Sequence, residues 1–237
     1  MSMPVCSGIL FDLDGVLVHS SAAVSRSWRR WAAENGLPVT TVEQSAHGRR
    51  TVDTVRVLAP HLDAAAEATR LEAEQARDTE GITAGTGAAA LLEALEPTEW
   101  AVVTSGTRPL ALARLAAAGL PRPGMLIAGD DVTSGKPSPE GYLRGAAALG
   151  HPPERCLVIE DAAAGIQAAR SAGAFVIGVT NGGEQTHLAG ADAIVQTLAD
   201  LQLRREPDGG IVLDAASAAR PGSPAGRSQG SWSAVDV

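Results

Sequence analysis

Short apolar runs alternate with amphipathic segments along most of the chain. After residue 81 the runs are continuously apolar, as in strands that are covered on both faces of a parallel sheet, and the segments between them have helical spacing. The predicted elements are strand 7–11, helix 87–95, strand 99–104, helix 108–118, strand 124–128, helix 139–149, strand 155–160, helix 162–172, strand 174–179 and strand 192–195. This order predicts an α/β fold, a Rossmann-like three-layer core with a central parallel sheet.

A block without convincing strands interrupts this alternation after the first strand. Residues 22–35 and 52–58 carry apolar side chains at helical spacing, and a further helix begins at Asp63. A later segment, rich in Ser, Gly, Pro and Ala, has no periodic apolar face. The predicted domains are an α/β core over 1–18 and 82–214, a small all-helical cap over 19–81 and a disordered tail over 215–237.

Composition and charge exclude several classes of partner. The chain has 237 residues, 45% of them hydrophobic, so it can bury a core and carry an inserted domain. Its net charge of -8 argues against a nucleic-acid surface, and no run of Lys and Arg suggests an anionic membrane. Two cysteines, no leader-like start and no apolar stretch of membrane-spanning length indicate a reduced, cytoplasmic location. We expect a monomer.

Two carboxylates follow the first strand directly, in the sequence Phe-Asp-Leu-Asp-Gly at 11–15. Successive side chains of an extended segment alternate in direction, so Asp12 and Asp14 point the same way at the carboxyl end of the strand. Two like charges held together need a cation or a proton between them. The same residue types also occur in ordinary turns and calcium loops, so this motif alone leaves a structural role open.

Three further polar clusters follow predicted strands or the loops after them: Ser105-Gly106, Lys136 and Glu160-Asp161. Each has a structural alternative, because Ser105 and Gly106 can cap a helix, Lys136 can be a solvated loop residue and Asp161 can be an N-cap. In a parallel sheet, however, all carboxyl ends meet at one edge. Together the clusters predict one pocket that holds a hydroxyl, an ammonium and four carboxylates.

These motifs, in this order, resemble those of the haloacid dehalogenase superfamily. The matching segments are Phe-Asp-Leu-Asp-Gly-Val-Leu at 11–17, Val-Val-Thr-Ser-Gly-Thr at 102–107, Ser-Gly-Lys-Pro-Ser-Pro at 134–139 and Ile-Glu-Asp-Ala-Ala-Ala-Gly-Ile at 159–166. The resemblance covers about residues 7–200. Within the superfamily the chain is similar to subfamily I members with a helical cap between the first two motifs, namely the sugar-phosphate and glycerol-phosphate phosphatases and the β-phosphoglucomutase group.

The resemblance implies a role for each motif residue. Asp12 would be the nucleophile that becomes an aspartyl phosphate, and Asp14 the acid for the departing alcohol and later the base that activates water. Ser105 and the N–H of Gly106 would bind a phosphoryl oxygen at a helix start. Lys136 would offset the negative charge of Asp12 and of the phosphoryl group.

Magnesium is the cofactor that the resemblance implies. Mg²⁺ prefers six oxygen ligands and keeps some waters, which suits Asp12, the main-chain carbonyl of Asp14, Asp161 and a phosphate oxygen. Glu160 would either act through a metal-bound water or hold Lys136.

In this family the choice of alcohol falls to the cap, because the core holds only phosphate and metal. The cap residues expected to line the substrate are His47, Arg49, Arg50 and Thr51. Arg49 is the strongest candidate, as a bidentate donor to substrate oxygens, while a solvated basic helix start is the alternative for the whole group. His19 stands where many relatives carry an aspartate, so no role of that acid in cap closure transfers to this chain.

The sequence therefore predicts a magnesium-dependent phosphatase acting on a small phosphorylated metabolite, of the hexose 6-phosphate, deoxysugar phosphate or glycerol 3-phosphate type. A phosphomutase like β-phosphoglucomutase is the alternative, because it uses the same motifs and returns the phosphoryl group from the aspartate. A dehalogenase is disfavoured because that branch lacks the second acid, whereas Asp14 is present. A non-catalytic binding protein is disfavoured because Asp12, Lys136 and Asp161 are all retained.

Overall fold

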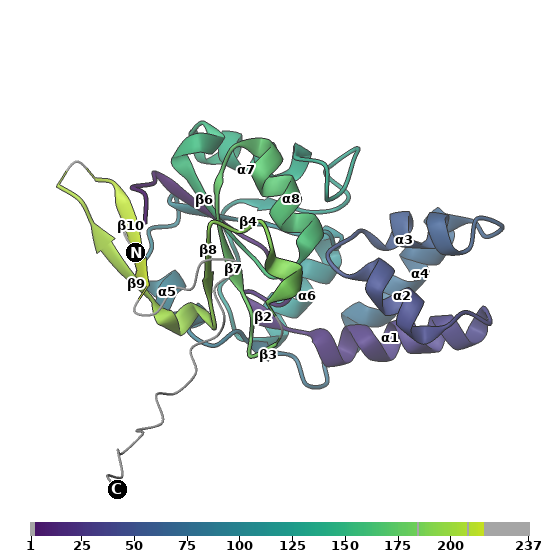
Figure 1. The fold of residues 1–237 in the computed structure, drawn as a ribbon. Coiled ribbons are helices and arrows are strands. Elements are labelled where there is room, and N and C mark those ends of the chain that lie inside the picture. The colour runs from purple at the N-terminus through teal and green to yellow at the C-terminus, as the bar shows by residue number, and fades with distance from the viewer. Residues whose placement is uncertain (1–2, 184, 208, 216–237) are drawn as a thin grey trace, which may run out of the picture.

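A six-stranded parallel sheet forms the centre of the computed structural model, which describes residues 3–183, 185–207 and 209–215 (Figure 1). In spatial order its strands are β5 (Leu126–Ile127), β4 (Trp100–Val103), β1 (Gly8–Phe11), β6 (Cys156–Glu160), β7 (Phe175–Val179) and β8 (Ala193–Val195). The chain runs outward from β1 to β5 and then crosses back to β6. The carboxyl end of β1 therefore lies where the strand order reverses, which is where ligand crevices form in such sheets.

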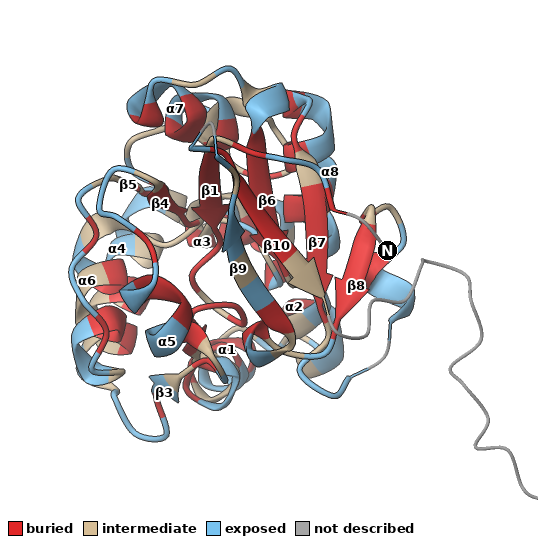
Figure 2. Ribbon diagram, turned by 90° about the vertical axis from the view of Figure 1, so that its left-hand side faces the viewer, coloured by how far each residue is buried: buried red, intermediate tan, exposed pale blue. Residues whose placement is uncertain are grey.

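Helices cover both faces of this sheet. One face carries α7 (Glu140–Leu149) and α8 (Ala163–Ala172); the other carries α5 (Ala88–Glu93), α6 (Arg108–Ala117) and the antiparallel hairpin of β9 (Leu201–Arg205) and β10 (Ile211–Ala215). Because side chains alternate along a strand, Leu10 packs in the first layer, and Ile9 and Phe11 pack in the second. Figure 2 shows the resulting buried strands between partly exposed helices. The predicted three-layer α/β core is confirmed.

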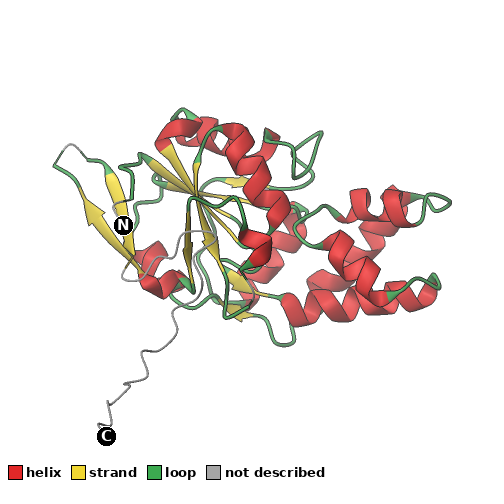
Figure 3. Cartoon of the chain, in the orientation of Figure 1, coloured by secondary structure: helices red, strands yellow, loops and turns green. Residues whose placement is uncertain are grey.

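Four helices lie together beyond one edge of this core (Figure 3). They are α1 (Ser21–Glu34), α2 (Val39–Ala46), α3 (Thr51–Leu58) and α4 (Ala64–Arg77). Their apolar side chains form a separate cluster, in which Trp28 and Trp31 meet edge to face with ring centroids 5.5 Å apart. Asp63 begins α4 as expected, since its carboxylate accepts hydrogen bonds from the N–H groups of Ala65 and Ala66.

Two short strands, β2 (Val18–His19) and β3 (Thr83–Ala84), pair where the chain passes from the core to these helices and back. Neither was expected from the pattern, nor were α2 and the β9–β10 hairpin. α2 has eight residues, including β-branched valines and threonines of low helix propensity, and it buries Val42 and Ala46 against its neighbours. Packing rather than intrinsic preference therefore accounts for this helix.

The predicted disordered tail, 215–237, begins at the last residue of β10, and residues 216–237 lie outside the described part of the chain. Within the described part, no helix combines the length and the apolar character needed to cross a membrane. Cys6 and Cys156 are both buried free thiols.

Candidate active site

Three carboxylates meet at the carboxyl ends of β1 and β6. These strands are parallel neighbours, with Phe11 opposite Ile159, so the residues that follow are brought side by side. Asp12, Glu160 and Asp161 each place one oxygen atom within 4.8 Å of the others. Asp12 is 7% exposed and Glu160 is fully buried. The predicted convergence of these strand ends is present in the structure.

Lys136 reaches this cluster from the loop between β5 and α7. Its Nζ contacts Oδ1 of Asp12 and lies 2.6 Å from Oε1 of Glu160. It also donates to the main-chain carbonyl of Val103, 3.3 Å away. The ammonium is therefore shared between two buried carboxylates and is not solvated.

Both oxygens of Glu160 are occupied by donors. Oε1 accepts from Lys136 and from the hydroxyl of Tyr142 at 2.8 Å, while Oε2 accepts from the N–H groups of Asp161 at 2.9 Å and Ala162 at 3.0 Å. These four bonds hold the carboxylate in place behind Lys136. Of the two roles considered for Glu160, this geometry favours the one that holds the lysine.

Two glycines allow the carboxylates to pack this closely. Gly15 has a φ of +81°, and a Cβ atom there would lie 1.8 Å from Oδ2 of Asp161. A Cβ atom on Gly165 would lie 1.5 Å from Oε1 of Glu160. Any larger residue at either position would displace a site carboxylate.

The charges of the cluster do not balance, since three carboxylates face one ammonium. Burial raises the pKa of Asp12 to about 7, against the opposing effect of Lys136, and burial together with Asp12 raises the pKa of Asp161 well above its usual range. Burial alone would lower the pKa of Lys136, but Asp12 and Glu160 raise it well above its ordinary value. Oxygen ligands with surplus negative charge fit a hard divalent cation.

The loop between β4 and α6 brings a hydroxyl and a helix start to the same place. The hydroxyl of Ser105 donates to the carbonyl of Gly48 at 3.0 Å, and the N–H of Gly106 donates to Oγ1 of Thr104 at 3.2 Å. Ser105 and Gly106 line the same pocket as Asp12. The loop therefore brings a hydroxyl group and the start of α6 to the pocket that Asp12 lines.

A pocket of about 220 Å³ opens between these loops and the four outer helices. Side chains that line it from the helical side include Ser25, Trp28, Glu43, His47, Arg49, Thr51 and Gln75. The exposed guanidinium of Arg49 forms no hydrogen bond or ion pair with any residue in the described part of the chain, and it is therefore available to a ligand. The ring of His47 stands edge to face with that of His187, with centroids 6.2 Å apart.

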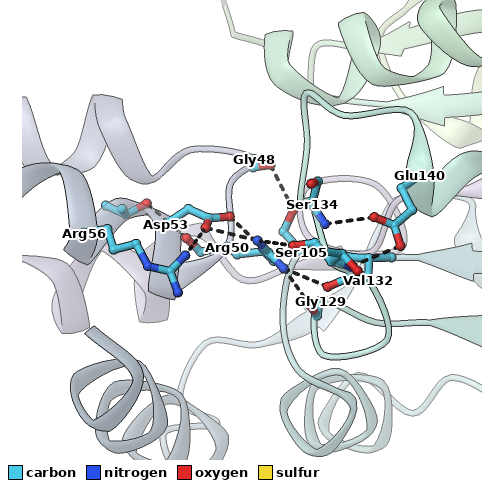
Figure 4. A network of polar contacts seen from close by, with 11 residues as sticks. Gly48, Arg50, Asp53, Arg56, Ser105, Gly129, Val132, Ser134 and Glu140 are labelled. Carbon is cyan, nitrogen blue, oxygen red and sulfur yellow. Dashed lines mark hydrogen bonds and ion pairs between the residues drawn. The ribbon is translucent and has the colours of Figure 1, made fainter. Parts of the chain in front are cut away.

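Arg50 does not line this pocket, unlike its neighbour Arg49; Figure 4 shows the polar contacts that Arg50 makes instead. Its guanidinium donates to the carbonyls of Val132 at 2.9 Å and Thr133 at 3.1 Å, in the loop that leads to the site lysine. Its side chain runs close against Gly135, where a Cβ atom would lie 2.6 Å from Nε. Arg50 was expected to line the substrate; the structure instead shows it joining the outer helices to the core.

Asp14 is held by donors that the sequence analysis did not identify. Its Oδ1 accepts from the hydroxyl of Ser20 at 2.5 Å, and its Oδ2 contacts Nη1 of Arg114. Nη2 of Arg114 donates to Oε1 of Gln75 at 2.6 Å. A signal was present for Arg114, because it falls on the buried face of α6 beside Leu115, where a charged residue is unusual.

The four motifs also fall within a recognised family. A family model described as haloacid dehalogenase-like hydrolase matches residues 6–173, which is well over half of the chain and includes all four motifs. The chain belongs to the haloacid dehalogenase-like hydrolases. The resemblance stated from the motifs, and the assignment to a class of hydrolases, are thereby confirmed.

Similar proteins of this haloacid dehalogenase-like group extend over nearly the whole chain. Hexitol phosphatase A of Escherichia coli (strain K12) is 41% identical over 213 residues, covering 88% of this chain and 99% of that protein. 2-Deoxyglucose-6-phosphate phosphatase 1 of Saccharomyces cerevisiae is 31% identical over 228 residues, and the alignment covers 86% of this chain and 93% of that protein. Among solved structures, CbbY from Rhodobacter sphaeroides in complex with phosphate is 25% identical, with a TM-score of 0.70, covering 82% of this chain and 96% of that one.

Proposed function

We propose that this hydrolase is a magnesium-dependent phosphatase that cleaves the monophosphate ester of a small sugar or polyol through an aspartyl phosphate. The observation that carries the proposal is the position of Asp12, a buried carboxylate that contacts Lys136, lies within 4.8 Å of an oxygen of Asp161 and lines a pocket. The similar proteins named as hexitol and deoxyglucose phosphate phosphatases support the substrate class.

In the first step a carboxylate oxygen of Asp12 attacks phosphorus, and the bond between phosphorus and the alcohol oxygen breaks. Asp14 gives its proton to the departing oxygen, so a neutral alcohol leaves. Lys136, the hydroxyl of Ser105 and the N–H of Gly106 stabilise the negative charge on the phosphoryl oxygens.

In the second step the carboxylate of Asp14 takes a proton from water, and the oxygen of that water attacks phosphorus. The bond between phosphorus and Asp12 breaks, which releases inorganic phosphate and restores the carboxylate of Asp12 and the protonated carboxyl group of Asp14. Glu160 acts throughout by holding Lys136 beside Asp12.

Asp12, Asp161 and the main-chain carbonyl of Asp14 would hold the magnesium ion. The ion supplies positive charge that offsets the approach of an anionic carboxylate to an anionic phosphate. Chelation is therefore expected to reduce phosphate release to the uncatalysed background, and added Mg²⁺ should restore it. Mg²⁺ should also raise the melting temperature of chelator-treated protein, because it neutralises crowded carboxylates. Undiminished rates in excess chelator would contradict this role.

Arg50 should affect turnover through the position of the outer helices. Arg50→Met removes charge-assisted bonds to Val132 and Thr133, so we expect kcat/KM to fall by about 10-fold or more. Arg56→Met is the matched control, because Arg56 also pairs with Asp53 but is exposed on α3 and has no ion pair to the core among the described residues. Equal values of kcat/KM for both variants, measured by steady-state phosphate release, would contradict the expectation.

A panel of phosphorylated metabolites tests the function itself. Phosphate release would be ranked by kcat/KM over hexitol phosphates, 2-deoxyglucose 6-phosphate, hexose 6-phosphates and glycerol phosphates. We expect the sugar and polyol monophosphates to rank first, and absence of release from all of them would reject the proposal. A hexose bisphosphate that accumulates from hexose monophosphate would identify the phosphomutase instead.

A further inference from the structure

Arg114 is a buried cation on α6 that the two-step reaction above does not use. Only 4% of the residue is exposed, and it lines the same pocket as Asp12. Nη1 contacts Oδ2 of Asp14, and Nη2 donates to Oε1 of Gln75, 2.6 Å away. We propose that Arg114 is a positioning residue that orients the general acid Asp14 and makes this orientation depend on the seating of α4. The inference rests on the proposed function, because it takes Asp14 as the acid.

Packing alone does not explain an arginine at this position. Leu110, Ala111 and Leu115 are buried around it on the same face of α6. A buried guanidinium is unfavourable unless all its donors are paired, and Nε of Arg114 is buried with no hydrogen-bond partner among the described residues. An apolar side chain of similar size would fill the same space without the cost of removing a charged group from water. The charge is therefore explained by the carboxylate that it contacts, Asp14.

The two oxygens of Asp14 have different partners. Arg114 occupies Oδ2, whereas Oδ1 accepts from the hydroxyl of Ser20 at 2.5 Å. Ser20 and Arg114 thus hold one oxygen each, which fixes the plane of the carboxyl group. A guanidinium does not lose its own proton in proteins, so Arg114 fixes the carboxylate without competing as an acid.

The same arginine connects Asp14 to the outer helices. Gln75 belongs to α4 and is itself buried, and its Nε2 donates to Oγ of Ser27 on α1 at 3.3 Å. Beside it on α4, Glu72 accepts from the N–H of Thr107 at the start of α6 at 3.0 Å. α4 thus rests on α6 through two polar contacts. When α4 is packed against α6 in this way, Oε1 of Gln75 accepts the hydrogen bond from Nη2 of Arg114.

The test compares two phosphate esters that differ in their need for an acid. An alkyl phosphate such as glycerol 3-phosphate must have its leaving oxygen protonated, whereas p-nitrophenyl phosphate releases a stable anion. The ratio kcat/KM reports the steps up to departure of the alcohol and excludes the later water step. We expect Arg114→Met to lower kcat/KM for the alkyl ester by about 100-fold, as loss of general acid catalysis does, and for the aryl ester by less than about 5-fold.

Asp14→Asn should show the same selective loss. Arg114→Lys should recover part of the activity on the alkyl ester, and Gln75→Met should produce a smaller loss of the same selectivity. Arg108→Met is the control on the same helix, because Arg108 pairs with Asp131 at 2.5 Å and is expected to leave both rates near those of the wild type.

Equal losses on both esters in Arg114→Met would show a purely structural role and overturn the proposal. If that variant does not fold, Gln75→Met decides, since an unchanged ratio between the two esters would overturn the dependence on α4. Failure of the proposed function is a separate outcome, seen as wild-type protein that hydrolyses neither ester in the presence of Mg²⁺.

Discussion

Asp12→Asn is expected to lower kcat for phosphate release by about 10⁴-fold or more, because an amide cannot form the acyl phosphate that a carboxylate forms. Wild-type protein quenched in acid during turnover should carry phosphate that hydroxylamine removes, and the variant should carry none. The two measurements together distinguish loss of the nucleophile from loss of substrate binding. Full activity in Asp12→Asn would reject the assignment.

The stability of the same variant shows whether its fold is intact. The folded-state pKa of Asp12, raised by burial to about 7, lies above its ordinary value of 3.8, so the folded protein binds more protons than the unfolded chain between these pH values. Ionisation of Asp12 therefore reduces the free energy of unfolding as the pH rises from about 4 to 7. In chelator, Asp12→Asn should melt above the wild type at pH 8, with the difference shrinking toward pH 4. A variant that melts far below the wild type at both pH values would contradict this.

Lys136→Met should remove both activity and stability. Without the ammonium, the buried carboxylates of Asp12 and Glu160 lose their common partner, and breaking a buried ion pair in this way destabilises proteins by about 3–5 kcal/mol. The positive charge beside the phosphoryl group is lost as well, so we expect kcat to fall by about 10³-fold. Urea unfolding and steady-state phosphate release measure the two effects.

The control for this substitution lies on α7. Arg144→Met removes a cation that pairs with Glu140 at 2.8 Å and whose side chain is 51% exposed, and ion pairs at the surface contribute about 0–1 kcal/mol. The destabilisation in Lys136→Met should also be smaller at pH 5 than at pH 8, because protonation relieves the repulsion between the buried carboxylates. If Lys136→Met and Arg144→Met had the same free energy of unfolding, this would contradict the role of Lys136 in stabilising the buried carboxylates.

The clustering of the acidic residues could be predicted from the sequence because it depends on a rule of sheet geometry. Asp12 and Glu160 each stand at the end of an apolar run, and the carboxyl ends of parallel strands share one edge whatever their exact order. The same rule placed Ser105 beside them. Gly15 and Gly165 accompany these motifs in the sequence, but their close approach to the carboxylates is visible only in the structure.

The partners of the three arginines could not be predicted in this way. Arg49 and Arg50 are neighbours with similar chemistry, yet one lines the pocket and the other binds carbonyls more than 80 residues further along the chain. Arg114 likewise meets Asp14 and Gln75 from two distant segments. Their contacts depend on how α1–α4 dock against the core.

By itself, then, the sequence determined the order of the strands and helices of the central sheet, the three-layer core and the set of groups at the end of β1, since local spacing decides which way each side chain leaves its own element. The tertiary structure alone decided which residues of the outer helices line the pocket and which form hydrogen bonds to the core. It also decided which side chains contact Asp14. Those outcomes depend on the packing of separate elements against each other, and the spacing of residues within one element carries no information about where its neighbour lies.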